Sequence, residues 1–556
     1  MASRARKLRP GPTATQSPEA AGVSLFTVFA LAIVTTLILY AAAARGQFLF
    51  DDIHLPFANP NAGNMPWRFW IGGVRPVLIA TYWANFLVFG TAPLAYHLVN
   101  SVIHAANATL IFQIASLLLK GNRPAVYFAT ALFLVHPLQA ESVAYIAGRS
   151  ELLSGTFVLA AWLVFLKADT AAISLRRGIA ILALWGLALG AKESAISLPL
   201  IFFVTDLARA RNFREGSRLH LRFFAVLATL GAIAAIGIVT ALSAHPLTGF
   251  GTRGTSPAFY LLSQMRAVLI YVRLFLAPVG QNGDWGIRAF NSLLDRGAFL
   301  YALAVLALGF AALRFQRDNH VWRLGFLFFA VSLAPASSIV PLPDILAERR
   351  LYLPIFGLIL MLVSVVPYNS RALLLTVVAV LSILTGLRAG VWANRLTFWF
   401  NATQGNPGNA RARIGYGTAL FERGQPRPAL EQFEAARRLD PASVLALANI
   451  ASAHQALADW KAARADLQQL AQLRPTAENF TLLGSVAARL SDVDQATLAL
   501  GKAIEIDPNY APAYGYLAAI EVAKNQIPEA RADIGRALAL DPNDAVALYA
   551  RGLLPK

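Results

Sequence analysis

Long apolar stretches without charged side chains fill most of the first 390 residues and constrain the fold more than any other feature. Residues 21–44 carry no charge and are long enough to cross a hydrocarbon core of about 30 Å. This stretch is too long for a signal-peptide core, so we expect an uncleaved first span. Further spans, about eleven in all, are expected at residues 95–119, 124–139, 150–166, 178–191, 194–208, 222–243, 297–313, 322–340, 351–367 and 372–387.

The composition excludes several classes of protein. Hydrophobic residues make up 57% of the chain and charged residues 14%, where a soluble domain has about 25% charged. The net charge of +18 comes mostly from basic residues between apolar blocks, so it does not indicate nucleic acid. The absence of cysteine excludes disulfides, Cys-ligated metal centres and thiol catalysis.

Basic residues between the expected spans predict the topology. Residues 1–20 form a polar, basic segment that we expect to be a disordered cytoplasmic tail. To keep the alternation of sides, residues 76–90 and 258–279 must be interfacial helices on the outer face. The loops assigned to the cytoplasm contain Lys120 and Arg123; Lys167, Arg176 and Arg177; Arg209, Arg211, Arg214 and Arg218; Arg314, Arg317 and Arg323; and Arg371.

The C-terminal part has a different pattern, a repeat. Five prolines recur at steps of 34, 34, 33 and 34 residues, a period typical of stacked helix–turn–helix units. We therefore expect a membrane domain at 21–390 and about four tetratricopeptide repeats at 391–556, on the outer, periplasmic side. The prolines are Pro407, Pro441, Pro475, Pro508 and Pro542.

Five ionisable clusters follow the apolar stretches at positions that this topology assigns to one membrane face. Ionisable groups at membrane depth are expensive and are usually functional. We expect the five clusters to meet in one site. They are Asp51 and Asp52 with Arg75 beyond them; His136, Glu141, Arg149 and Glu151; Lys192 and Glu193; Asp284; and Glu348, Arg349 and Arg350.

Each cluster also has a structural interpretation. Asp51 and Asp52 could cap a helix, Arg349 and Arg350 could reach toward lipid headgroups, and Asp284 could belong to a turn. A non-enzymatic membrane scaffold that recruits partners through its repeats is one alternative function. A transporter is another, although transporters usually place such residues near the membrane midplane.

The order of these motifs resembles one family. DD after the first span, RP before YHLVNSVIH, then HPLQAESVAYIAGRSE, AKES, DWG and ERRLYLP, ending in repeats, is similar to the transmembrane and tetratricopeptide repeat-containing proteins. That resemblance implies an all-α polytopic fold of the GT-C glycosyltransferase class. It also implies transfer of mannose from a polyprenyl-phosphate carrier onto Ser or Thr of a protein acceptor, which the repeats would bind.

The chemistry of such a transfer assigns roles to the clusters. A carboxylate must accept the proton of the acceptor hydroxyl, and we expect Asp51 to do so, with Asp52 positioning it or sharing the task. Cations must neutralise the departing phosphate: Arg349 and Arg350, helped by Arg75, Arg149 or Lys192. No metal is required, although a divalent cation is compatible. The residues expected to contact the sugar or acceptor, or to orient the cations, are His136, Glu141, Glu151, Glu193, Asp284 and Glu348.

Overall fold

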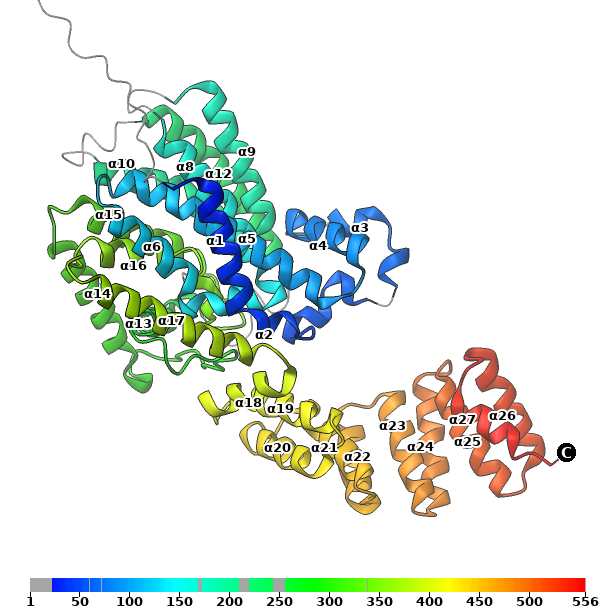
Figure 1. Ribbon diagram of the computed structural model, residues 1–556. Helices are drawn as coiled ribbons and strands as arrows, with labels where there is room; N and C mark the ends of the chain where they lie inside the picture. Colours follow the sequence, from blue (N-terminus) through cyan, green and yellow to red (C-terminus); the bar gives the residue numbers. More distant parts are fainter. Residues whose placement is uncertain are drawn as a thin grey trace, which may run out of the picture. The chain divides into compact units, whose positions relative to one another are not determined.

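The computed structural model describes residues 23–59, 61–71, 73–168, 173–209, 220–243, 256–337 and 339–555, and its regular elements are all helical. The chain divides into two units (Figure 1). One comprises Met1–Gln281 and Ala289–Ala393, and the other comprises Asn282–Arg288 and Asn394–Lys556. The expected tail 1–20 and the loop residues Arg211, Arg214 and Arg218 lie outside the described residues.

The first unit, called the membrane unit below, has a helix at every apolar stretch expected from the sequence. Its helices are α1 (Leu25–Leu39), α2 (Ala41–Ala44), α3 (Trp67–Ile71), α4 (Pro76–Phe89), α5 (Pro93–Leu118), α6 (Arg123–Val135), α7 (Ala140–Ala144), α8 (Arg149–Leu166), α9 (Leu175–Ala191), α10 (Leu198–Arg209), α12 (Leu221–Ser243), α13 (Pro257–Leu276), α14 (Ala298–Arg314), α15 (His320–Leu333), α16 (Ile355–Val363) and α17 (Arg371–Val391).

Six segments of the described chain are helical, long and apolar enough to cross a membrane, so this is a multi-pass membrane protein. They are Pro93–Leu118, Ile146–Leu166, Leu221–Thr240, Pro257–Leu276, Asp295–Arg314 and Arg371–Val391. Four apolar helices, α1, α4, α6 and α15, are shorter. The expectation of about eleven full-length spans is therefore met only in part, because turns shorten several helices: α15 ends at Leu333, and α16 has only nine residues.

Helix α13 covers the stretch expected to be interfacial, and it is also long and apolar enough to span a membrane. Its contacts run along loop segments. The Gln264 amide donates to the Ile345 carbonyl at 3.0 Å, and the Tyr271 hydroxyl donates to the Ala347 carbonyl at 3.0 Å. Near its end, the Phe275 carbonyl lies 3.1 Å from Nε2 of His136. Both halves of α13 therefore pack on the loops that carry the ionisable clusters.

Close helix packing in the membrane unit depends on small residues. A Cβ added to Gly325 of α15 would lie 2.6 Å from the carbonyl oxygen of Gly357 in α16, and a Cβ on Gly357 would meet Gly325 in the same way. Glycines allow the two backbones to approach this closely, as is common between membrane helices. Elsewhere α1 runs beside α5 (Figure 1).

The second unit, called the repeat unit, consists of antiparallel helix pairs. Small residues are buried where paired helices touch, as the 34-residue period predicts; a Cβ on Gly484, for example, would lie 2.7 Å from Leu500. The helices are α18 (Arg395–Gly405), α19 (Ala410–Glu422), α20 (Pro426–Leu439), α21 (Val444–Ala456), α22 (Trp460–Leu473), α23 (Ala477–Arg489), α24 (Val493–Ile506), α25 (Ala511–Ala523), α26 (Ile527–Leu540) and α27 (Ala545–Gly552).

Candidate active site

The paired aspartates lie on a 3₁₀ turn, Phe50–His54, that follows α2. The Asp52 side chain is buried, and its carboxylate accepts the backbone N–H of Leu49 at 3.1 Å and that of Ala147 at 2.8 Å. Burial raises the pKa of Asp52 to about 7. Asp51 is exposed, and its backbone N–H donates to the Tyr145 hydroxyl at 2.9 Å. The turn thus presents one carboxylate outward and uses the other to hold itself in place.

The segment between α6 and α8 forms the surface on which this turn rests. Pro137 begins a short turn after α6, and α7 follows. Gly148 packs so tightly that a Cβ there would lie 2.5 Å from the Ser142 carbonyl oxygen, which explains the glycine in the IAGR motif. This packing buries Tyr145 and leaves its hydroxyl against the aspartate turn.

Arg349 approaches the same tyrosine from another segment of the chain. Its guanidinium carbon lies 5.9 Å from the centre of the Tyr145 ring. Glu141, which is almost fully buried, accepts hydrogen bonds from the Arg349 side chain at 2.5 Å and from its backbone N–H at 3.1 Å. Asp51 and Arg349, 298 positions apart in sequence, therefore contact one side chain.

Two further ion pairs hold the loop after α9, one to the loop before α4 and one to the first turn of α8. Arg75 binds Glu193 through two hydrogen bonds of 2.9 and 2.8 Å, and Lys192 pairs with the buried Glu151. Burial opposes the ionisation of Glu193, but the charges of Arg75 and Lys192 outweigh it and lower the pKa to about 2. Burial lowers the pKa of Lys192, against the attraction of Glu151.

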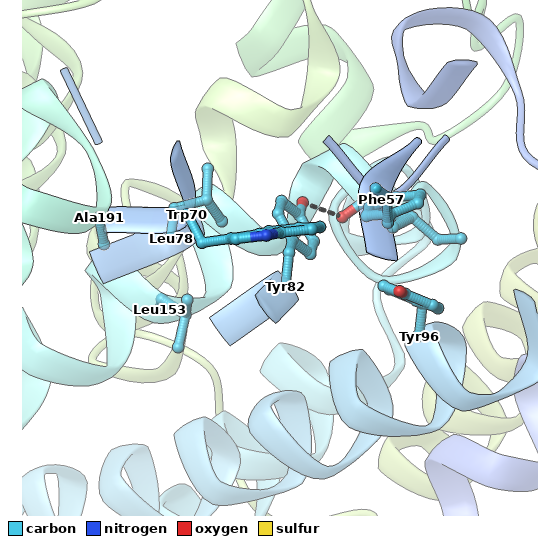
Figure 2. Packing of buried hydrophobic residues seen from close by; sticks show 9 residues of the cluster. Phe57, Trp70, Leu78, Tyr82, Tyr96, Leu153 and Ala191 are labelled. Carbon is cyan, nitrogen blue, oxygen red and sulfur yellow. Dashed lines mark hydrogen bonds between the residues drawn. The ribbon is translucent and has the colours of Figure 1, made fainter. Parts of the chain in front are cut away.

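Arg149 has a different environment from the one expected for a phosphate ligand. It is fully buried, and its guanidinium lies 4.6 Å from the centre of the Tyr82 ring. Figure 2 shows Tyr82 within the surrounding aromatic cluster. The three guanidinium nitrogens of Arg149 donate to protein oxygens of Asn100, Thr81, Asn85 and Tyr96. This arginine ties the start of α8 to α4 and α5, so we assign it to the support of the site.

Glu348 and His136 are also held by the protein. Glu348 is fully buried; it accepts a hydrogen bond of 2.6 Å from Gln281 and lies 3.4 Å from Arg388. His136 accepts the N–H of Leu138 at Nδ1 and contacts the Phe275 carbonyl through Nε2, while burial lowers its pKa to about 4. Both residues connect segments of the membrane unit.

Arg350 faces a cavity that also contains Lys192. We call it the serine-lined cavity, because Ser154, Ser194, Ser197 and Ser332 form much of its wall together with Glu151. The Arg350 guanidinium donates to the carbonyls of Asp344 and Ile345 at 2.7 and 3.0 Å. The cavity has a volume of only about 20 Å³, and the Glu151 carboxylate in it already pairs with Lys192. It therefore brings Lys192 and Arg350 close together but has room for little more than a water molecule.

An apolar groove of about 680 Å³ lies between α13, α14, α15 and α16. Its walls are almost entirely aliphatic and aromatic. The C-terminal end of α15 separates it from the serine-lined cavity, since Ser332 and Ala336 line the cavity whereas Ala334 and Ser337 line the groove.

Asp284 belongs to the repeat unit, where its carboxylate binds the Arg411 guanidinium at 2.8 and 2.5 Å. From the sequence, Asp284 was expected to orient a cation of the membrane region or to contact the sugar. The structure instead gives it a partner in α19, because residues 282–288 pack with the first repeat helices.

Sequence reasoning missed Tyr145, Arg388 and Asn100. Tyr145 stands in an apolar block where an aromatic residue is ordinarily core, and Asn100 carries no charge. Arg388, near the end of α17, had the clearest signal, a basic residue immediately after a span. Among the described residues, no group of three or more His, Asp or Glu side chains is placed to hold a metal ion.

Comparison with known proteins finds one relationship for the repeats and one for most of the chain. Residues 477–510 match the tetratricopeptide repeat family. The protein O-mannosyl-transferase F38B6.6 of Caenorhabditis elegans is 26% identical over 442 residues, covering 74% of this chain and 62% of that protein. Protein O-mannosyl-transferase TMTC3 of Mus musculus is 24% identical over 499 residues, covering 79% and 54%.

The chain thus spans between about half and three fifths of the length of these relatives. The alignment covers about three quarters of the chain, more than the 391–556 repeat region could supply alone. The chain is therefore a homologue of the transmembrane and tetratricopeptide repeat-containing protein O-mannosyl-transferases.

Proposed function

We propose that this protein is a membrane glycosyltransferase that transfers a hexose, mannose by analogy with its relatives, from a polyprenyl-phosphate donor to Ser or Thr of a protein acceptor. The observation that carries the proposal is the meeting of Asp51 and Arg349 on Tyr145. The Asp51 backbone and the Arg349 guanidinium contact the same side chain, so the residue proposed as base and the cation proposed for the phosphate belong to one region, as this transfer needs.

In this mechanism Asp51 is the general base. It is the exposed member of the pair and can reach an incoming hydroxyl, whereas Asp52 is buried and engaged by two backbone N–H groups. Asp52 positions Asp51 by fixing the turn. Attack of the hydroxyl at the anomeric carbon inverts that centre, so a β-linked donor gives an α-linked product.

Arg349 would hold the donor phosphate, with Glu141 fixing the guanidinium. The planar guanidinium matches phosphate oxygens, and a water-poor site strengthens the attraction. Arg350 and Lys192 in the serine-lined cavity would add positive charge, while Arg75, engaged by Glu193, supports them. Glu151 would orient Lys192.

The apolar groove supports a lipid-linked donor. A polyprenyl chain stays in hydrocarbon, so its phosphate is presented only to residues beside a membrane-accessible apolar surface. The groove lies across the end of α15 from Lys192 and Arg350, and it would take the polyprenyl chain.

For the orientation, we propose a cytoplasmic N-terminus, about eleven crossings and repeats in the periplasm of a bacterial inner membrane. The contacts of α13 with loop segments favour its interfacial placement on the outer face, which keeps Asp51 and Arg349 on one side. Single cysteines at the exposed Leu294 and Asp318 test this. An impermeant maleimide should label Leu294→Cys from outside and Asp318→Cys only after lysis; the reverse would make α13 a crossing helix.

The activity itself is tested with purified protein, a panel of polyprenyl-phosphate sugars and a Ser/Thr peptide. We expect the mannose donor to be consumed and the peptide to gain a hexose. If no donor in the panel is consumed by wild-type protein or converted to glycopeptide, the enzyme proposal fails, and the scaffold and transporter alternatives come first.

A further inference from the structure

A second pocket lies beside the aspartate turn, and the proposed transfer chemistry does not use it. Its volume is about 610 Å³. We call it the aromatic pocket. The residues that matter here are Gln47, Phe48, Phe57, Asn59, Phe86 and Thr91, and none of the described residues that line it is charged.

The aromatic wall is fixed by its own packing. The Phe57 ring lies 4.9 Å from that of Phe48, 4.4 Å from Tyr96 and 5.2 Å from Tyr82. Behind it, Phe86 stacks on Trp70 at 5.3 Å. Figure 2 shows Phe57, Tyr82 and Tyr96 gathered in one cluster, where the Tyr82 hydroxyl donates to the Ile146 carbonyl. A ligand would therefore meet a preformed surface, which lowers the ordering cost of binding.

The pocket wall and the carboxylates belong to one short segment. Phe48 lines the pocket, the N–H of the next residue, Leu49, is bound by Asp52, and Asp51 stands two residues further on. Arg349 contacts this segment through Tyr145, which does not line the pocket. The aromatic pocket therefore lies within three residues of Asp51 along the chain, and no arginine or lysine is among the described residues that line it.

The chemistry of the lining selects among ligands. A phosphate would find no cation here. Phenylalanine faces accept apolar side chains, and the Gln47 and Asn59 amides can both donate to and accept from a peptide backbone. Building on the proposed transferase activity, we propose that the aromatic pocket binds the protein acceptor: a neutral peptide segment whose apolar side chain, next to the modified Ser or Thr, sits against Phe48 and Phe57.

A glycine on the rim allows the pocket to be filled without disturbing its core. A Cβ on Gly63 would meet no atom within 4 Å, so Gly63→Trp should fold and occupy the pocket with its ring. We expect the KM for a short neutral Thr peptide to rise about tenfold or more, with hydrolysis of the donor by water unchanged. Gly63→Ala and Gly535→Trp, a second open position in α26, should behave as wild type.

Equal loss of donor hydrolysis and peptide transfer in Gly63→Trp would overturn the pocket assignment while leaving the transferase proposal intact. If wild-type protein neither hydrolyses nor transfers any donor, the transferase proposal fails instead.

Binding can be followed without catalysis. Because the chain lacks cysteine, Gly63→Cys provides a single site for a fluorescent label. The neutral Thr peptide should change the label's emission in a saturable way, and the same peptide with Glu on both sides of Thr should do so much more weakly. Equal responses to both peptides, no response, or a response to methyl mannoside instead would each contradict the proposal.

Discussion

Each unit contains an arginine paired with a buried carboxylate, yet the two pairs have different surroundings. Glu141 and Asp284 have side chains that are each 1% exposed; their partners Arg349 and Arg411 are 20% and 47% exposed. Arg411 fastens residues 282–288 to α19 in the repeat unit. Arg349 lies over Tyr145, beside the turn that carries Asp51. The two ion pairs have the same chemistry, so only the residues around each pair indicate whether it belongs to a functional site.

The largest effect is expected at Asp51, the exposed carboxylate of the 3₁₀ turn in the membrane unit. Asp51→Asn removes the proposed base and should lower sugar transfer by about a hundredfold to ten-thousandfold. Membrane insertion and abundance should stay as in wild type. Asp318→Asn, an exposed carboxylate elsewhere, is the matched control. Full activity of Asp51→Asn would remove it as the base.

The two arginine pairs can be compared directly. Arg349→Gln should lower the turnover number by about a hundredfold, because it removes a cation from the departing phosphate. Arg411→Gln, tested with the same donor and peptide, should change the turnover number little. An equal loss of activity in both variants would contradict this prediction, because both arginines would then have a structural role.

The pH dependence sharpens the distinction between Asp51 and Asp52. Since burial raises the pKa of Asp52 to about 7, kcat/KM should rise with pH through about 7 as the ionised carboxylate engages Leu49 and Ala147. The folded state binds the Asp52 proton more tightly than the unfolded state does. The contribution of Asp52 to the free energy of unfolding should therefore fall as the pH rises from about 4 to 7. In Asp52→Asn, both dependences should flatten; an unchanged pH–rate profile would assign the titration to another group.

The smallest effect is expected within the repeats. Gly484→Leu places atoms where Leu500 packs and should destabilise the repeat unit by about 1–3 kcal/mol. Gly501→Leu, at an open position, should cost less than about 0.5 kcal/mol. Limited proteolysis measures both. Donor hydrolysis should remain in both variants, and its loss in Gly484→Leu would couple repeat stability to the chemistry.

Much of the architecture could be predicted from the chain's periodicities. Each apolar stretch forms a helix, and the 34-residue period gives the repeat pairs, because both signals are local. Helix length was less predictable: residues 351–354 form turns before α16, although the stretch reads as apolar.

Partners within the site could be predicted least. Arg149 stands in the sequence among the ionisable residues of a predicted cluster, yet amide and carbonyl oxygens from α4 and α5 surround it. Asp284 meets a residue 127 positions away in the repeats. Such pairings depend on tertiary packing between distant segments, which neither charge nor spacing encodes.

One ring joins the segment of the proposed base to the proposed phosphate ligand. The Tyr145 hydroxyl accepts the Asp51 backbone N–H while the Arg349 guanidinium lies over its ring, so a single phenol links two segments that are 298 positions apart in sequence. Tyr145→Leu would leave both charged residues in the chain and would remove only the contact that they share.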